Sequence, residues 1–265
     1  LHAERVGHLV AGGEVGAPLV EHPDVPHIGF TGGEIAGQKI YEAAARGLKT
    51  VTLELGGKSP NIVFDDADLD LAVKLCVQGR LFNNGQTCVG AKRFVVTEKN
   101  YDAFVQGYTK AFGEITIGDP NDTDTQLGPL VSCRQRDQVH AQVAESVAKG
   151  ARILVGGTVP ERSGWFYPAT ALVDVASGQP AYDDEIFGPV AAIIKAKDDE
   201  DAMRIANDSR YGLGGGIFSK DVERAVQMAA TYFDTGMVNI NTFALASPDM
   251  PFGGVKDSGY GREHG

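Results

Sequence analysis

The sequence has few cysteines, no surplus of basic residues and no long apolar run. Its three cysteines are an odd number, which argues against a disulfide framework and is typical of a reducing compartment. Acidic residues outnumber basic ones by 35 to 24, and the formal charge of −11 argues against a nucleic-acid or anionic-membrane surface. Without a membrane-length apolar run or a signal-peptide pattern, we expect a cytoplasmic protein that binds neither nucleic acid nor membrane.

Short apolar runs alternate with helical patterns along the chain, which predicts an α/β fold with a largely parallel sheet. The expected strands are 6–13 (running into a glycine turn), 27–30, 50–55, 61–64, 94–96, 153–155, 191–195, 214–218 and 237–241. The expected helices are 14–20, 34–46, 69–81, 100–113, 134–149, 198–208 and 221–233.

Cys88 is the candidate nucleophile. It lies between Gly85 and Gly90 in the segment FNNGQTCVGAKR, whose bare backbone and polar residues favour an accessible loop. A free cysteine is more often a small buried hydrophobe. That structural interpretation suits Cys76, which lies in an apolar helical pattern, and Cys133, which lies near a helix start.

Glu54, in the segment LELGGK, is the candidate base. A thiol with an ordinary pKa of about 8.5 is a weak nucleophile at neutral pH, so a cysteine nucleophile needs a nearby base, dipole or positive charge. Glu54 ends an apolar strand, and Gly56 and Gly57 leave room at the strand end, where catalytic groups often lie. The alternative is a surface glutamate on an edge strand.

The acidic cluster at 65–68 precedes a predicted helix, and we interpret it as helix capping. It lacks the glycine and the distal glutamate of a calcium loop, so no metal site is expected. Lys58 follows Gly57 and either neutralises a phosphate or is solvated, and we favour solvation. Asn241 fits a turn as well as it fits a substrate contact.

Together the segments LELGGK and FNNGQTCVGAKR resemble the active-site signatures of the aldehyde dehydrogenase superfamily, and the resemblance runs through nearly all 265 residues. It implies a partial Rossmann-type cofactor domain and an α/β catalytic domain. It also implies oxidation of a small-molecule aldehyde to the acid with NAD or NADP. Cys88 would form the thioester and Glu54 would activate the hydrolytic water. The full-length form is expected to be a homo-oligomer.

The same resemblance assigns cofactor contacts to Gly32, Gly33, Leu55, Gly56, Glu185 and Phe187. The segment FTGGEIAG forms a strand-to-helix turn that would approach the pyrophosphate, although the family usually has serine at position 33. Glu185 in the segment DEIFGP would grip the ribose next to the nicotinamide. Phe187 would pack beside the ring, with ordinary core packing as its alternative.

The resemblance also divides the chain into a remaining part of the cofactor domain at 1–56, a catalytic domain at 57–250 and the start of a C-terminal segment at 251–265. The late segment GVKDSGYGRE is most similar to succinate-semialdehyde-type members. Arg93, Arg262 and Lys256 are candidates to meet an acidic substrate tail. We expect a fragment truncated at both ends, with an exposed sheet edge near His27.

Two other functions stay open at this point. A CoA-acylating dehydrogenase would pass the acyl group to a thiol, but Glu54 stands where hydrolysing members keep their base. An inactive fragment or scaffold is the third hypothesis, because the asparagine that completes the oxyanion site in the family lies upstream of Leu1.

Overall fold

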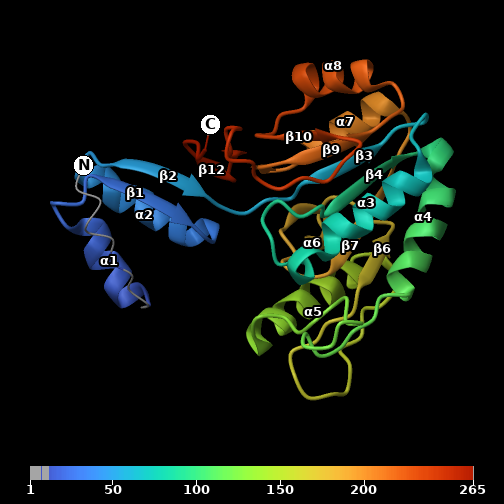
Figure 1. Ribbon diagram of the computed structural model, residues 1–265, viewed down its shortest axis with the longest axis horizontal. Helices are drawn as coiled ribbons and strands as arrows, with labels where there is room; N and C mark the ends of the chain where they lie inside the picture. The colour runs from blue at the N-terminus through green and yellow to red at the C-terminus, as the bar shows by residue number, and fades with distance from the viewer. Residues whose placement is uncertain (1–6, 8–11, 265) are drawn as a thin grey trace.

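The fold is known from a computed structural model that describes Gly7 and residues 12–264. The apolar part of the strand expected at 6–13 lies outside these residues. Figure 1 shows a small sheet with two helices beside a larger body, and the chain that runs from β2 to β3 connects them.

The small sheet has the order β1-β2-β12. Strands β1 (His27–Thr31) and β2 (Thr50–Glu54) are parallel, and β12 (Gly259–Tyr260) pairs with β2 in the antiparallel direction. Helices α1 (Gly13–Glu21) and α2 (Glu34–Arg46) belong to this part. Its core is small and apolar, formed by Ile28, Ala44, Val51, Leu53 and Leu55. The end of the chain therefore returns to the sheet formed near its beginning.

The large sheet has the order β10-β9-β3-β4-β7-β6-β5, and all its pairings are parallel except that of β5 with β6. Its strands are β3 (Pro60–Val63), β4 (Arg93–Thr97), β5 (Arg152–Val155), β6 (Thr170–Val173), β7 (Val190–Ala196), β9 (Gly215–Phe218) and β10 (Val238–Ile240). A sheet buried on both faces needs near-continuous apolar strands, and β3, β4 and β6 are buried along their whole length.

Alternate residues of these strands pack into two separate hydrophobic cores, one on each face of the sheet. Val95 packs in one, whereas its neighbours Phe94 and Val96 pack in the other. One face is covered by α3 (Leu69–Leu81) and α4 (Glu98–Gly113). The opposite face is covered by α5 (Cys133–Ala148), α6 (Pro180–Asp183), α7 (Asp199–Asn207) and α8 (Val222–Tyr232). Within the described residues, none of the helices has the length and apolar composition needed to cross a membrane.

The predicted α/β class is confirmed, and α2 and α3 have the bounds that the sequence predicts. The other predicted elements in the described residues are present, with ends that differ by one or two residues. Strand β6 was not predicted, although it pairs on both sides, between β7 and the edge strand β5. Two short hydrogen-bonded strands, β8 (Tyr211–Gly212) and β11 (Val255–Lys256), were not predicted either. Among the described residues β1 pairs with β2 alone, so it forms the expected edge.

One residue of the acidic cluster at 65–68, Asp68, has the predicted capping role. The side chain of Asp68 accepts a hydrogen bond from the Leu71 N–H at 3.1 Å and caps α3. Asp66 instead accepts from the Ser219 hydroxyl and the Asp221 N–H, both at 2.9 Å. It therefore joins this turn to the start of α8.

Replacing Asp68 by alanine removes the cap of α3, and we expect a loss of about 1 kcal/mol in the free energy of unfolding. Urea unfolding followed by circular dichroism measures it. Asp65→Ala, at an exposed position in the same turn, is the matched control. Equal losses in the two variants would contradict the capping role.

Candidate active site

A cleft of about 530 Å³ lies where the carboxyl end of β2 meets the loops that precede β4 and β7. It is lined by Thr31, Gly32, Gly33, Leu55, Gly56, Gln86, Thr87, Cys88, Gln135, Gln138, Glu185 and Phe187. Seven residues proposed from the sequence therefore meet in one cleft: Cys88 and the six cofactor candidates. Glu54 is the remaining candidate, and it precedes Leu55 at the rim.

The Cys88 loop, residues 82–92, leaves α3 through an unusual backbone turn. It begins with η1 (Phe82–Gly85), in which Asn83, Asn84 and Gly85 have φ values of 51°, 55° and 73°. Asparagine and glycine tolerate this left-handed conformation better than other residues. The buried Arg80 guanidinium donates to the Gly85 carbonyl at 2.6 Å and holds the turn in place.

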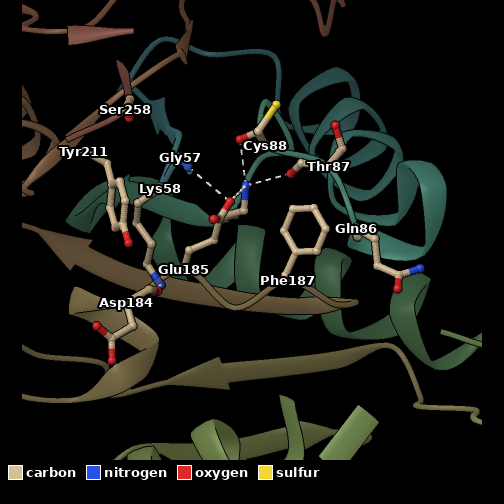
Figure 2. Close-up of polar contacts among 12 residues, drawn as sticks. Gly57, Lys58, Gln86, Thr87, Cys88, Asp184, Glu185, Phe187, Tyr211 and Ser258 are labelled. Atoms are coloured by element: carbon tan, nitrogen blue, oxygen red, sulfur yellow. Dashed lines mark hydrogen bonds and ion pairs between the residues drawn. The ribbon is translucent and has the colours of Figure 1, made fainter. Parts of the chain in front are cut away.

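Cys88 is half-buried and has no disulfide partner. In Figure 2 its sulfur points away from Glu185 and Phe187, which lie on the other side of the loop backbone. Burial raises the pKa of the Cys88 thiol, the nearby Lys92 ammonium acts to lower it, and Glu185 acts to raise it. Burial therefore disfavours the thiolate most, and the Lys92 charge acts against that effect.

Cys76 and Cys133 differ from Cys88 in their surroundings. Cys76 is buried at 1% exposure in the core beneath α3, and burial raises its thiol pKa well above the ordinary value. Cys133 is exposed at the start of α5 and contacts Asp137. Neither residue lines the cleft, in agreement with the structural or incidental interpretation of both thiols.

Glu185 is fixed by two contacts, both made through Oε1. This atom accepts a hydrogen bond from the Gly57 N–H at 3.1 Å and lies 3.0 Å from the Lys92 ammonium (Figure 2). A Cβ atom at Gly56 would lie 2.6 Å from Oε2, so glycine is what allows the carboxylate to approach this strand end. Lys92 was not proposed from the sequence, because a lysine at the start of an apolar strand has no distinguishing local pattern.

Glu54 is buried at 1% exposure, and neither carboxylate oxygen has a hydrogen-bond partner among the described residues. Burial, with a further contribution from Glu263, raises its pKa to about 7, while Arg262 acts in the opposite direction. The alternative of a surface glutamate on an edge strand is therefore wrong, because β2 lies between β1 and β12. Its Oε1 lies beside Gly253, and no hydrogen bond in the described part of the chain joins it to Cys88.

The cleft fits a dinucleotide. Gly33 is the N-cap of helix α2, where no side chain caps the first turn and a Cβ would meet nothing within 4 Å. Uncapped N–H groups and the helix dipole favour an anion such as a pyrophosphate at this position. Glu185 makes its contacts within the protein through Oε1, which leaves Oε2 for a sugar hydroxyl. Phe187 faces the same cleft and is not confined to the core.

Two expectations for cationic residues are wrong. Lys58 is 2% exposed and donates to the carbonyls of Pro180 and Asp184, whereas solvation was expected. Arg93 is fully buried and donates to backbone carbonyls at the end of α7, so it is not available to a substrate tail. The Lys58 and Arg93 side chains are buried by segments more than 100 residues away in the chain. The residues next to them in the sequence do not indicate this burial.

The other polar candidates lie outside the cleft. Lys256 pairs with Asp234 at 3.1 Å, and Arg262 donates to the Gly254 carbonyl at 2.9 Å. Asn241 has a φ of 51°, and its side chain bonds both the N–H and the carbonyl of Ser219. These contacts support the turn interpretation of Asn241.

Replacing Gly85 by alanine tests the Cys88 loop. The position has a left-handed backbone, and a Cβ would lie 2.3 Å from the Gly188 carbonyl oxygen, so either the turn or the neighbouring loop must shift. We expect a loss of about 1–3 kcal/mol in the free energy of unfolding, measured in urea. Gly29→Ala is the control, since a Cβ there meets nothing within 4 Å. Similar stabilities of the two variants would contradict the assigned turn.

Replacing Glu54 by glutamine tests its buried carboxyl. The folded pKa of about 7 exceeds the ordinary 4.5, so the folded state binds more protons than the unfolded state between these values. Stability is therefore lost as pH rises through this window. We expect Glu54→Gln to stabilise the chain by up to about 3 kcal/mol near a pH of about 8 and by little under acidic conditions.

The measurement is urea unfolding across this pH range, with Glu161→Gln at an exposed loop position as the control. A pH-independent difference between Glu54→Gln and the unaltered chain would show that Glu54 keeps an ordinary pKa.

Comparisons with known proteins identify relatives of the chain. Succinate-semialdehyde dehydrogenase [NADP(+)] of Deinococcus radiodurans is 46% identical over 245 residues, which cover 92% of this chain and 51% of that protein. Succinate-semialdehyde dehydrogenase [NADP(+)] 1 of Mycobacterium tuberculosis is 42% identical over 255 residues, which cover 96% of this chain and 55% of that protein. The chain thus spans about half the length of the curated relatives it matches.

Solved structures match as well. Betaine aldehyde dehydrogenase of Staphylococcus aureus in complex with NAD+ superposes with a TM-score of 0.93 at 38% identity, over 97% of this chain and 52% of that one. An aldehyde dehydrogenase of Mycobacterium tuberculosis complexed with NAD+ superposes with a TM-score of 0.92 at 40% identity. The match covers 96% of this chain and 53% of that one. The model of the aldehyde dehydrogenase family matches residues 4–265. The chain belongs to the aldehyde dehydrogenase family.

Proposed function

We propose that this chain oxidises an aldehyde to the carboxylic acid with NAD+ or NADP+, through a thioester on Cys88 that is hydrolysed with Glu54 as base. The observation that carries the proposal is the cleft itself. It combines a half-buried free thiol, an oriented carboxylate at Glu185 and the uncapped amino end of α2. A thiol beside a dinucleotide-sized cleft suits covalent oxidation of a carbonyl compound.

The names of the relatives narrow the choice of substrate and cofactor. The curated proteins are succinate-semialdehyde dehydrogenases that use NADP+, whereas the two solved structures contain NAD+. We therefore propose succinate semialdehyde as the first substrate to test and keep both cofactors. The proposal assigns residues 1–56 to the cofactor domain, 57–250 to the catalytic domain and 251–265 to the segment that returns toward the cofactor side.

The first step belongs to Cys88. Its thiolate attacks the aldehyde carbon, which forms a carbon–sulfur bond and moves the carbonyl electrons onto oxygen. The Cys88 N–H is a donor available to that oxyanion. When bound, the dinucleotide would supply the hydride acceptor, and loss of hydride from the same carbon would leave a thioester on Cys88. Glu185 would hold a ribose hydroxyl of the dinucleotide, Phe187 would pack beside the nicotinamide ring, and the start of α2 would bind the phosphates.

The second step belongs to Glu54. Its carboxylate takes a proton from water, the resulting hydroxide adds to the thioester carbon, and the carbon–sulfur bond breaks to release the acid and the Cys88 thiolate. A pKa of about 7 suits a base that must accept and return a proton near neutral pH. Two carboxylates with different environments thus have different tasks, because Glu185 pairs with Lys92 whereas Glu54 has no hydrogen-bond partner among the described residues.

The proposal also includes a homo-oligomeric full-length form. Two large apolar side chains beside the small sheet are exposed. Ile35 of α2 is 72% exposed, and Leu48 in the turn that follows α2 is 94% exposed. Exposed apolar residues suit a contact with a second copy, as does β1, which pairs with β2 alone among the described residues.

The test is aldehyde-dependent formation of NADH or NADPH by this 265-residue chain, with succinate semialdehyde and a simple aliphatic aldehyde. We expect turnover that Cys88→Ala abolishes, because no other cysteine lines the cleft. Cys133→Ala, at an exposed thiol outside the cleft, is the matched control and should retain activity. The product should be the free acid whether or not coenzyme A is present.

A folded chain that forms no reduced cofactor with either aldehyde would overturn the proposal for this chain. Turnover that survives Cys88→Ala would overturn the assigned nucleophile. Glu54→Gln should release reduced cofactor once per Cys88 and retain the acyl group on that residue, which peptide mass analysis detects. Unchanged steady turnover in Glu54→Gln would overturn its role as base.

A further inference from the structure

Lys92 is a buried cation that the reaction steps above do not use, although it contacts three residues that line the cleft, Thr87, Cys88 and Glu185. Its side chain is 1% exposed, and its ammonium has three partners: the carbonyls of Thr87 and Cys88 at 2.8 and 2.7 Å, and Glu185 Oε1 at 3.0 Å. An ammonium group has three N–H donors. Each donor therefore has one acceptor, so the buried charge is fully hydrogen-bonded.

These contacts join two loops that are far apart in the chain. Two of the three acceptors, the carbonyls of Thr87 and Cys88, belong to the Cys88 loop. The third is Glu185 Oε1 in the loop before β7. Glu185 is held in turn by the Gly57 N–H at the start of the connection to β3. Three segments that converge on the cleft are thus tied to one ammonium group.

We propose that Lys92 is a positioning residue that fixes the Cys88 backbone relative to Glu185 and supplies the positive charge that favours the Cys88 thiolate. The inference rests on the proposed function, in which Cys88 is the nucleophile and Glu185 binds the cofactor ribose. No neutral side chain of similar length replaces Lys92, because methionine has no donor and glutamine has two.

The charged groups around the thiol act in opposite directions. Lys92 acts to lower the pKa of Cys88, and Glu185 acts to raise it. Burial and the Arg80 guanidinium lower the pKa of Lys92. Glu185 and Cys88 act to raise it. The buried Lys58 is also close enough to interact with Lys92. The ion pair with Glu185 keeps the Lys92 charge inside the protein.

The experiment follows the reaction of Cys88 with iodoacetamide as a function of pH, in which the thiolate displaces iodide. Mass analysis of the tryptic peptide that contains Cys88 separates it from Cys76 and Cys133. The variants are Lys92→Met and Glu185→Gln, with Lys197→Met as the control because that lysine side chain is 82% exposed. Circular dichroism establishes that each variant is folded.

For Lys92→Met we expect a midpoint of alkylation about one pH unit higher and a reaction about tenfold slower at neutral pH. Glu185→Gln removes the opposing charge, so its midpoint should fall and its reaction at neutral pH should be faster. Lys197→Met should match the unaltered chain. A purely structural role for Lys92 would change stability without moving the midpoint.

An unchanged midpoint in folded Lys92→Met, or shifts of the same sign in the two variants, would overturn the inference. If Lys92→Met does not fold, Glu185→Gln still decides, since a midpoint that does not fall contradicts the balance of charges at Cys88. The assay needs neither aldehyde nor cofactor. Its result is therefore independent of whether Cys88→Ala abolishes NAD(P)H formation.

Discussion

The ion pair between Lys92 and Glu185 is the contact on which the geometry of the cleft depends. Strands β4 and β7 are parallel neighbours, so the loops that precede them emerge at the same edge of the large sheet. Lys92 ends one loop and Glu185 lies in the other, and their 3.0 Å contact fixes the distance between them. A buried pair of this kind is costly to break, because removal of either partner leaves an uncompensated charge.

Two features at the cleft reduce the stability of the folded chain. Glu54 is buried with no hydrogen-bond partner in the described part of the chain, and the Cys88 loop includes three successive residues with left-handed backbone. Unpaired buried charge and strained turns reduce stability, and they concentrate at functional sites. The large sheet compensates with two apolar cores, one on each face. The rigid sheet therefore supports a less stable site at its edge.

Local sequence predicted the regular elements well where a physical signal was present. Helix α3 has its predicted bounds because Asp68 caps its start and its apolar residues recur with helical spacing. Strand β6 was missed because it is short and alanine-containing, and its identity as a strand comes from pairing with β5 and β7. The error at Lys58 has a similar origin, since the carbonyls that surround it belong to residues 180 and 184.

The sequence by itself determined the α/β class, most element bounds and the residue types of the site, because periodicity, caps and glycine-rich segments are local properties of the chain. It also identified Cys88 and Glu54 as candidates, through their glycine-containing segments and the resemblance of both segments to a family's active-site signatures. Only the tertiary structure decided that Glu185 meets Lys92, that Glu54 is buried with no hydrogen-bond partner among the described residues, and that Lys58 and Arg93 are closed off from solvent. Contacts of this kind depend on which loops share a sheet edge, and that is set by strand order rather than by neighbouring residues.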